Sequence, residues 1–428
     1  MKTYYTATLG CKINQYETRS VSEAWTAAGA KETEDPSRAE VILINSCAVT
    51  ANAVADLRRM VRKLKRENPE AEIVITGCAA QAARDEIGEM PEISRIVPHK
   101  DKAALLQGPT APLPETRTNA FPPFSVSGYG RARAVVKVQD GCSHRCTYCI
   151  VPLARGRSVS RPEGEVLDEL ARLLDAGFRE MVLSGVNLRQ FGRDLPNEPD
   201  FWDLLRRIED RFGDEWGGRA RLRISSLEPG QLGDKALETL SESRLVCPQL
   251  HLSLQSGDPD VLRRMGRGHY RAEQALEFLE RLKDVWPVFG LGADVLTGFP
   301  GESDEEFGRT VEFCRRLPLS YAHVFPYSPR PDTPAAVMKD QVAPAVKKAR
   351  AKKLRELAGK KKSAFLKRLL ELPSLSVLVQ DEEGKGVSEF YSSCRLEPPG
   401  GDIRSLVECR PLRIERGVIV CEELKRRC

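Results

Sequence analysis

The chain has 428 residues, a formal net charge of +5 and 12 cysteines, and these figures exclude several classes of protein. The cysteines are too dispersed for a small disulfide scaffold, the first nine residues lack the apolar core of a secretory signal, and no apolar run approaches the roughly 18 residues that span a bilayer. We therefore expect a cytoplasmic protein of about two to four domains, without a membrane segment.

The first hundred residues alternate strand-like and helix-like stretches. The predicted order is a strand at 3–9, a helix at 14–28, a strand at 40–45, a helix at 51–67, a strand at 72–76 and a further helix beginning near Gln81. Strands that alternate with helices predict a parallel sheet with helices packed on its faces. We assign residues 1–106 to this α/β domain.

A cysteine follows each of the three strands by one or two residues: Cys11, Cys47 and Cys78. The carboxyl ends of the strands form the ligand-binding edge of an open α/β sheet, so we expect these cysteines to converge there. Three thiolates can hold a four-iron cluster and leave one iron without a protein ligand. The alternative is three small buried residues at crowded strand ends.

A segment rich in Pro and Gly, residues 107–130, is predicted to be a linker. Six strands are predicted beyond it, at residues 134–139, 180–184, 221–225, 249–254, 291–296 and 321–325. Amphipathic helical stretches, such as residues 162–176 and 303–316, separate them. Six β/α units predict a partial barrel over residues 131–343, with its active site at the carboxyl ends of the strands.

The most specific motif follows the first of these barrel strands. Cys142, Cys146 and Cys149 form a C-x3-C-x2-C run. Three thiolates this close can hold three corners of an iron–sulfur cube and leave the fourth iron open to bind a small molecule. The alternative is a zinc ion bound by the three cysteines and His144, although structural zinc loops usually draw their ligands as two separated pairs.

Positive charge is concentrated near the C-terminus. Between residues 344 and 372, eleven Lys or Arg stand against two Glu, a local charge of +9 that leaves −4 for the rest of the chain. Such a stretch is the electrostatic footprint expected of a nucleic-acid binder, and a solvated helix face is the alternative. We assign residues 344–372 to a basic helical connector.

The last residues, 373–428, contain short β-like runs separated by Gly- and Pro-rich turns. The predicted strands lie at residues 375–379, 389–393, 405–409 and 417–421. They predict a small all-β barrel, a form often used to bind RNA. Four cysteines here have no paired spacing and are interpreted as free thiols: Cys394, Cys409, Cys421 and Cys428.

Several strings of residues match those of a known family. Around the C-x3-C-x2-C run they are residues 138–142 (VQDGC), 225–229 (SSLEP), 254–257 (LQSG) and 298–302 (GFPGE), and in the first domain residues 8–18 (TLGCKINQYET), 45–50 (NSCAVT) and 76–81 (TGCAAQ). With these strings the chain resembles the radical S-adenosylmethionine (SAM) methylthiotransferases over residues 1–370. The tail resembles a TRAM domain, a small RNA-binding barrel.

Within this family, residues 9–17 (LGCKINQYE) and 324–330 (VFPYSPR) are similar to the tRNA methylthiotransferases that act on N6-threonylcarbamoyladenosine. The isopentenyladenosine enzymes usually carry Met-Asn in place of Ile13-Asn14 and Asp in place of Tyr16. The ribosomal-protein enzymes usually have Pro in place of Lys12. The resemblance therefore favours a threonylcarbamoyladenosine substrate.

The resemblance implies two 4Fe-4S clusters with different tasks. The cluster held by Cys142, Cys146 and Cys149 would bind SAM and cleave it to a 5′-deoxyadenosyl radical, chemistry that only a cofactor makes reasonable at an aromatic C–H. The cluster held by Cys11, Cys47 and Cys78 would carry an extra sulfur, which a first SAM methylates. A second SAM would then drive transfer of the methylthio group to C2 of the adenine at tRNA position 37.

The resemblance and the position of strand ends also suggest contact residues. Tyr148 occupies the position near the adenine of SAM, and Glu228, Gln255 and Ser256 are candidates for polar contacts to SAM, with structural hydrogen bonding at the barrel rim as the alternative. No catalytic residue is assigned beyond the cluster ligands. The expected tRNA-binding residues, which would contact phosphates, are Lys347, Lys348, Arg350, Lys352 and Lys353.

The expected partners are tRNA, SAM, an electron donor of the flavodoxin or ferredoxin type and a source of sulfur. Two alternatives share the same chemistry, with isopentenyladenosine tRNA or a ribosomal-protein aspartate as the substrate. An alternative of another class is a non-catalytic iron–sulfur protein that binds RNA. Release of 5′-deoxyadenosine from SAM would separate a catalyst from such a binding protein.

Overall fold

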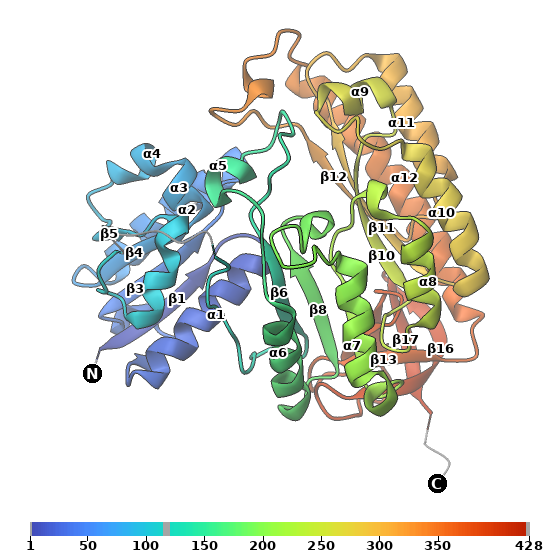
Figure 1. Ribbon diagram of the computed structural model, residues 1–428, viewed down its shortest axis with the longest axis horizontal. Coiled ribbons are helices and arrows are strands. Elements are labelled where there is room, and N and C mark those ends of the chain that lie inside the picture. Colours follow the sequence, from blue (N-terminus) through green and yellow to red (C-terminus); the bar gives the residue numbers. More distant parts are fainter. Residues whose placement is uncertain (1, 114–119, 425–428) are drawn as a thin grey trace.

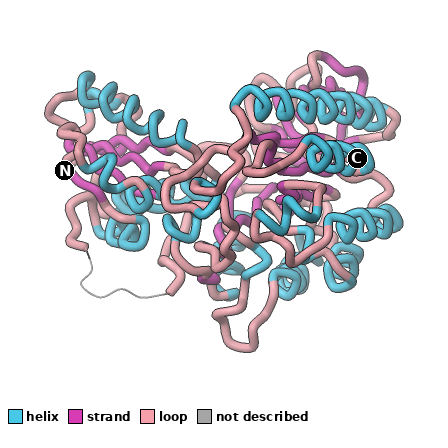
Figure 2. Tube along the Cα trace, turned by 90° about the horizontal axis from the view of Figure 1, so that it is seen from above, coloured by secondary structure: helices cyan, strands magenta, loops and turns pink. Residues whose placement is uncertain are grey.

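The computed structural model describes residues 2–113 and 120–424, which build three parts that follow one another along the chain (Figure 1). A five-stranded sheet comes first, two sheets of an incomplete barrel follow, and a closed five-stranded barrel comes last. Seen from above, the N-terminal sheet and its helices lie to one side of the remaining structure (Figure 2). The predicted α/β fold class, with its three kinds of sheet, is confirmed.

The N-terminal sheet is parallel and has the strand order β2-β1-β3-β4-β5. Its strands are β1 (Thr3–Thr8), β2 (Lys31–Glu32), β3 (Val41–Ser46), β4 (Glu72–Gly77) and β5 (Arg95–Ile96). Its helices are α1 (Lys12–Ala27), α2 (Ala51–Glu67), α3 (Cys78–Ala82) and α4 (Arg84–Gly88), with 3-10 turns at Pro36–Arg38 and His99–Gln107. Every residue of β3 is buried, as expected for a central parallel strand covered by helices on both faces.

The central part contains the six predicted strands in sequential, parallel order. They are β6 (Ala134–Asp140), β8 (Glu180–Gly185), β9 (Arg221–Ile224), β10 (Gln249–Gln255), β11 (Gly290–Thr297) and β12 (Tyr321–Pro326), with the short antiparallel β7 (Val159–Ser160) beside β6. Isolated parallel bridges, Leu222 to Val246 and Leu227 to Leu252, join the two sheets between β9 and β10. The result is the partial barrel that the sequence predicted.

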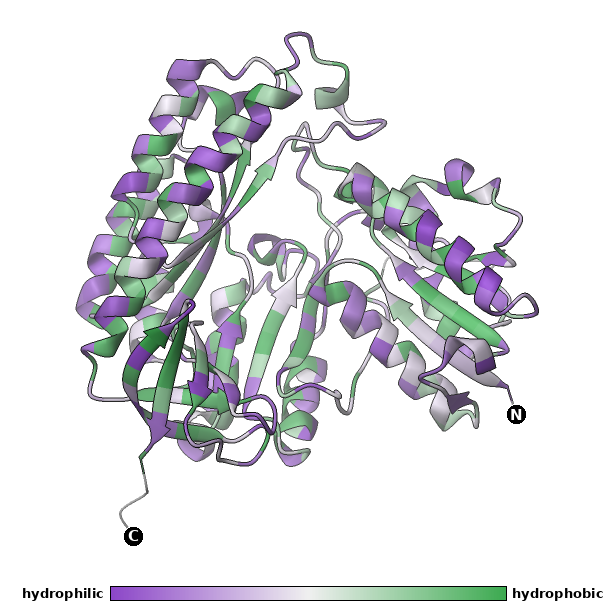
Figure 3. Cartoon of the chain, turned by 180° about the vertical axis from the view of Figure 1, so that it is seen from behind, coloured by the Kyte–Doolittle hydropathy of each residue, from purple (hydrophilic) through white to green (hydrophobic). Residues whose placement is uncertain are grey.

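Helices cover the outside of this barrel (Figure 1). They are α6 (Glu163–Asp175), α7 (Phe201–Trp216), α8 (Asp234–Glu242), α9 (Pro259–Arg264), α10 (Ala272–Val285), α11 (Asp304–Arg316) and α12 (Pro344–Leu370). The short α5 (Val151–Arg155) instead packs against the N-terminal part beside α3, with Ala154 in the core of that part (Figure 1). Figure 3 shows hydrophobic strands behind helices whose outer sides are hydrophilic. In the described part of the chain, we find no helix with both the length and the apolar character needed to cross a membrane.

The C-terminal barrel is closed by β13 (Leu375–Val379), β14 (Lys385–Ser388), β15 (Ser393–Leu396), β16 (Leu406–Glu415) and β17 (Val418–Glu423). The strand predicted at residues 389–393 is wrong, because residues 389–392 form the turn between β14 and β15. Tyr391 has a φ of +64° there, which is unfavourable in the interior of a strand. The aromatic pair Phe390-Tyr391 is a strand-like sequence, but it serves to dock this turn against the central barrel.

Cysteines of the C-terminal barrel behave as predicted where the structure describes them. Cys394, Cys409 and Cys421 are free and buried, and Cys428 lies outside the described residues. The predicted linker also falls partly outside them, at residues 114–119.

Candidate functional site

The C-x3-C-x2-C cysteines, here named the central trio (Cys142, Cys146 and Cys149), lie in the loop between β6 and α5. This loop follows the carboxyl end of the first barrel strand, where the sequence placed the active site. Gly141 has a φ of +66°, and a Cβ there would meet the carbonyl oxygen of Arg157 at 1.9 Å. A glycine is therefore required for the loop to fold back on itself, which the bond from Cys142 N–H to the Gly156 carbonyl (3.0 Å) completes.

Polar side chains direct N–H groups at the sulfurs of the central trio. Asn187 and Gln190 donate to Cys142 Sγ at 3.6 and 3.7 Å, and Arg267 Nη1 lies 3.9 Å from Cys146 Sγ. Such donors stabilise anionic thiolates and the sulfurs of a metal cluster. Burial raises the pKa of the Cys149 thiol to about 12, so its thiolate form requires a bound cation.

The zinc alternative requires the three sulfurs and His144 to lie close to one another. A tetrahedral zinc with Zn–S bonds of about 2.3 Å brings its sulfurs to about 3.8 Å from one another. Among the described residues, no group of three potential ligands lying within 4.8 Å of one another includes the central trio. His144 Nδ1 already lies 3.3 Å from a Glu228 oxygen. His144, which would be the fourth ligand of a zinc ion, is thus engaged by Glu228.

Glu228 forms the polar centre beside this loop. Its carboxylate accepts from Asn187 (3.1 Å) and His269 (3.1 Å), and it pairs with Arg267 at 3.4 Å. Burial alone would raise the pKa of Glu228, but the hydrogen bond from His144, the charge of Arg267 and the hydrogen bond from His269 outweigh it and hold this pKa well below its usual range. Glu228 is therefore a fixed negative charge at the edge of the central trio.

The other predicted SAM contacts have different surroundings. Tyr148 packs against an apolar cluster that includes Phe299, and burial raises its pKa. Gln255 ends β10 with a φ of +63°. The Ser256 hydroxyl is fully buried and bonded to the Thr310 hydroxyl at 3.0 Å, so it serves the fold, and the hydrogen-bonding alternative applies to it.

The three early cysteines, here named the N-terminal trio (Cys11, Cys47 and Cys78), converge as predicted at the carboxyl edge of the first sheet. Cys11 precedes α1, Cys47 follows β3, and Cys78 is the first residue of α3. Gly10 has a φ of +125°, and a Cβ there would meet Cys47 Cβ at 2.8 Å, so only glycine lets these two loops approach. The pKa of Cys47 is raised by burial and also by the neighbouring thiols of Cys78 and Cys11.

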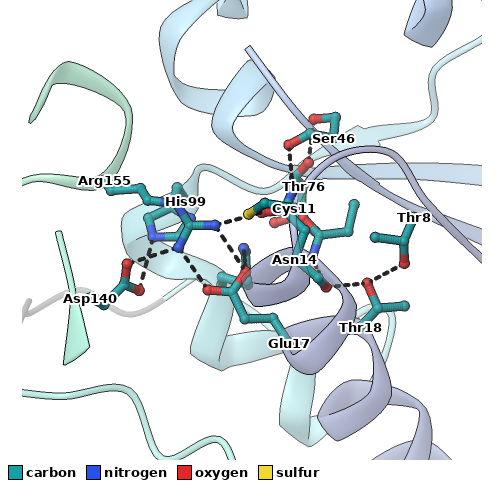
Figure 4. A network of polar contacts seen from close by, with 12 residues as sticks. Thr8, Cys11, Asn14, Glu17, Thr18, Ser46, Thr76, His99, Asp140 and Arg155 are labelled. Atoms are coloured by element: carbon teal, nitrogen blue, oxygen red, sulfur yellow. Dashed lines mark hydrogen bonds and ion pairs between the residues drawn. The ribbon is translucent and has the colours of Figure 1, made fainter. Parts of the chain in front are cut away.

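A buried arginine connects the N-terminal trio with the central barrel (Figure 4). Arg155 in α5 donates to Asn14 Oδ1 at 2.6 Å, to Glu17 Oε1 at 3.0 Å and to Asp140 Oδ1 at 2.8 Å. Asn14 and Glu17 belong to α1, just after Cys11, whereas Asp140 ends β6, just before the central trio. One side chain therefore spans the interface between the two cysteine loops.

Further buried charges complete this network. Lys137 Nζ lies 2.8 Å from Glu17 and 2.5 Å from Asp140, and Lys102 pairs with Glu17. His99 Nε2 lies 3.5 Å from Asp140 Oδ2, and burial together with the nearby cations lowers the pKa of His99 to about 4. Sequence reasoning missed this network, because buried charges from four separate segments leave no local pattern.

The basic helix α12 divides the predicted tRNA-binding residues into two groups. Lys348, Lys352 and Lys353 are exposed to solvent and are available to an anionic partner. Lys352 has only a long contact of 3.9 Å to Glu356, four residues further on.

Two of the predicted residues are instead occupied within the protein. Arg350 is buried, and its guanidinium pairs with Glu302 (2.6 Å) and Asp304 (2.7 Å). Lys347 donates to the Tyr327 carbonyl at 3.3 Å and lies over the Tyr327 ring. Their position on the inner side of the helix explains the difference from Lys348 and Lys352.

The inner face of the barrel carries polar and aromatic groups that the sequence did not reveal. Asp294 on β11 lies 3.0 Å from His251 Nε2 and 3.2 Å from His323 Nδ1. Burial raises the pKa of Asp294, but the hydrogen bonds from both histidines outweigh it and lower this pKa to about 2. Phe325, two residues after His323 on β12, is 48% exposed, which leaves an aromatic face open to a ligand.

Comparison with known proteins places these sites in a family. Residues 136–314 match the radical SAM superfamily, and residues 3–98 match the uncharacterized protein family UPF0004. A threonylcarbamoyladenosine tRNA methylthiotransferase MtaB from Chlamydia pneumoniae is 34% identical over 98% of both chains, and one from Bacillus subtilis is 36% identical over 88% of this chain and 85% of its own. A tRNA-2-methylthio-N(6)-dimethylallyladenosine synthase from Mycobacterium bovis is 34% identical over 90% of this chain and 77% of its own.

A solved structure shows the same fold. The radical SAM methyltransferase TsrM from Kitasatospora setae, with cobalamin and a 4Fe-4S cluster bound, superposes with a TM-score of 0.56 at 14% identity, over 78% of this chain and 77% of its own. From the matches over nearly the whole length, the chain belongs to the radical SAM methylthiotransferase family and is an enzyme that uses SAM and an iron–sulfur cluster.

Proposed function

We propose that this enzyme transfers a methylthio group to C2 of N6-threonylcarbamoyladenosine beside the anticodon of tRNA. The observation that carries the proposal is the 34% identity over 98% of both chains to a relative named for that substrate. The string LGCKINQYE at residues 9–17 supports it. An unpaired base next to the anticodon can be turned out of the loop into a protein site, as RNA recognition generally requires.

The central trio is proposed to hold the SAM-binding 4Fe-4S cluster, and the N-terminal trio a second one. Three converging thiols at each site support this assignment, because soft thiolates suit iron–sulfur ligation. Reductive cleavage of SAM and carriage of a transferable sulfur are the chemistry that these groups supply when bound. Asn187, Gln190 and Arg267 orient the thiolates, and Glu228 presents its carboxylate where the cationic or amino groups of SAM would lie.

The remaining assignments follow from the same reaction. The enzyme would need a flavodoxin- or ferredoxin-type electron donor and a source of sulfur, and a tRNA substrate would place it in the cytoplasm. Lys348, Lys352 and Lys353 on α12 would contact tRNA phosphates. The C-terminal barrel is proposed to be a TRAM-like RNA-binding module.

The test is to express the chain in a host that lacks its own methylthiotransferases and to digest its tRNA to nucleosides for mass spectrometry. We expect the 2-methylthio derivative of N6-threonylcarbamoyladenosine, and its loss when either trio is replaced by Ala. Methylthiolated isopentenyladenosine would instead favour the activity named for the relative from Mycobacterium bovis. Unmodified tRNA beside a methylthiolated ribosomal protein would refute the tRNA assignment.

A further inference from the structure

Strand β12 presents two exposed rings to the interior of the central barrel. Val324 packs into the core between the sheet and its helices, so its neighbours His323 and Phe325 face inward, because side chains alternate along a strand. Phe325 is 48% exposed and is the most exposed Phe, Tyr or Trp in the described part of the chain. His323 is exposed too, with its ring centroid 6.2 Å from that of Phe325. The protein thus leaves an aromatic face open on the inner wall of its barrel.

This face lies at the end of the barrel that carries the central trio. Phe325 is paired in register with Leu296 on β11. Leu296 belongs to an apolar cluster that also contains Tyr327, two residues after Phe325, and against which Tyr148 packs. Because Tyr148 lies in the loop of the central trio, a group that stacks on Phe325 is brought to the place where SAM is proposed to be cleaved.

A chain of hydrogen bonds holds His323 in one orientation. His323 Nδ1 lies 3.2 Å and His251 Nε2 3.0 Å from Asp294 Oδ1, and the Tyr321 hydroxyl lies 3.0 Å from His251 Nδ1. Gly292 makes this chain possible, because a Cβ there would meet Tyr321 Cζ at 2.2 Å and His251 Nδ1 at 2.4 Å. The arrangement is therefore a built one, in which the side chains of three strands support the exposed imidazole of His323.

The same chain of bonds decides which nitrogen of His323 is available to a ligand. Asp294 is ionised, since its pKa is lowered to about 2, and an ionised carboxylate can only accept hydrogen bonds. His323 therefore carries its proton on Nδ1, and Nε2 of the neutral ring is an acceptor. Among the described residues, Nε2 of His323 has no hydrogen-bond partner.

The proposed tRNA-binding helix lies beside this strand. β12 is the last strand in the order β10-β11-β12, and α12 runs alongside it (Figure 1). Arg355 of α12 donates to the Val324 carbonyl at 2.8 Å. An RNA held by the exposed lysines of α12 would therefore lie next to β12, and an unpaired base of that RNA has a short path to the inner wall.

We propose that the target adenine of the tRNA binds on the inner face of β12, where it stacks on Phe325 and donates a hydrogen bond from its N6 substituent to His323 Nε2. This inference rests on the proposed function. Aromatic side chains commonly hold bases that are turned out of an RNA loop. Stacking alone leaves a base free to rotate in its plane. A bond on the N6 side fixes that rotation, and with it the direction in which C2 points.

The test of Phe325 compares the binding of two anticodon stem-loop RNAs to reconstituted full-length enzyme. One carries N6-threonylcarbamoyladenosine at the target position, and the other carries an abasic nucleotide there. Wild type should bind the first about tenfold more tightly, the scale of one stacked base. Phe325→Ala should bring this ratio towards one by weakening only the RNA that has the base, and Phe325→Tyr should keep it. Leu412→Ala removes a similarly exposed apolar side chain (41%) from the C-terminal barrel, and should also keep the ratio.

The test of His323 uses a third RNA, with unsubstituted purine at the target position, which has no N6 group. His323→Leu should lose about threefold or more in affinity for the threonylcarbamoyl RNA, the scale of one neutral hydrogen bond, and nothing for the purine RNA. His323→Gln should lose less, because its amide oxygen is also an acceptor. Equal losses on both RNAs would show that His323 does not contact the N6 side of the base.

Further measurements separate base binding from a structural role. Iron content and SAM cleavage without RNA should stay at wild-type levels in every one of these variants. If wild type binds the abasic RNA as tightly as the native one, or if Phe325→Ala keeps the wild-type ratio, the base does not stack on Phe325, and this inference is overturned while the proposed function stands. Failure of wild type to bind any of the RNAs, together with unmodified cellular tRNA, would refute the proposed function itself.

Discussion

Replacing His99 by Gln should remove a pH dependence from the stability of the protein. His99 is buried in the charge network between the first sheet and the central barrel, where its Nε2 lies 3.5 Å from Asp140. Burial, Lys102 and Arg155 lower its pKa to about 4, compared with about 6.5 in an unfolded chain. The unfolded chain therefore binds a proton more tightly, and stability falls as the pH falls from about 6.5 towards 4.

The size of this effect follows from the two pKa values. A pKa difference of about 2.5 between the folded and unfolded states contributes about 3 kcal/mol to the free energy of unfolding at most. About 2 kcal/mol of this contribution is lost between pH 7.5 and pH 5. Glu17 and Asp140, whose pKa values are lowered well below normal by the cations despite burial, lose their contribution only below about pH 4.5. Glu389 has the opposite sign: burial raises its pKa to about 7, so its contribution is lost as the pH rises.

Because the contributions of His99 and Glu389 oppose each other, the wild-type profile alone does not reveal either. The measurement is the guanidinium unfolding free energy of wild type and His99→Gln under anaerobic conditions at several pH values between 5 and 7.5. We expect the variant to lose about 2 kcal/mol less than wild type on going from pH 7.5 to pH 5. Parallel profiles for the two proteins would show that His99 is not held neutral, and would refute this reading of the network.

Three further predictions concern the clusters, the tRNA surface and the SAM site. Replacing either trio by Ala should halve the iron content from about eight per chain, measured by metal analysis, and only the central-trio variant should lose SAM cleavage. The double variant Lys348→Gln, Lys352→Gln should weaken tRNA binding and reduce the salt dependence of that binding, by up to about one unit of slope per lost phosphate contact. Arg350→Gln, on the same helix, should instead destabilise the fold by about 3–5 kcal/mol, because it leaves Glu302 buried without its partner. Glu228→Gln should retain iron but weaken SAM binding in equilibrium dialysis, since the fixed negative charge is lost; unchanged affinity would exclude a contact to SAM.

The sequence predicted those parts of the fold whose pattern is local. Helix α2 begins and ends where the apolar periodicity placed it, and each barrel strand was found because its apolar run is short and bounded by turns. The turn containing Tyr391 was misread as a strand, since its aromatic residues are selected for docking against a distant part of the chain. The composition of the basic helix also does not reveal that Arg350 is buried and pairs with Glu302 while Lys352 is exposed to solvent.

The cysteine trios could be predicted for a related reason. Each cysteine closely follows a strand that can be recognised in the sequence, and parallel strands bring their carboxyl ends to one edge of the sheet. The convergence of the three cysteines therefore follows from the topology of the sheet. No local sequence pattern identifies Arg155 in this way. Its importance comes from Asn14 and Glu17, more than a hundred residues away in the sequence, and such a relation is visible only when the chain is folded.

The Arg155 network also has a consequence for the order of events during synthesis. Glu17 precedes Lys137 and Arg155 by 120 and 138 residues, so the N-terminal helix that carries Glu17 is synthesised before its buried partners in the central barrel exist. Asn14 is already held within the N-terminal part by its bonds to the carbonyls of Leu9 (3.2 Å) and Ser46 (2.9 Å), and Arg155 adds a contact of 2.6 Å from the barrel. A chain that stops before residue 155 therefore carries all three cysteines of the N-terminal trio but lacks the side chain that joins Asn14 and Glu17 to the central barrel.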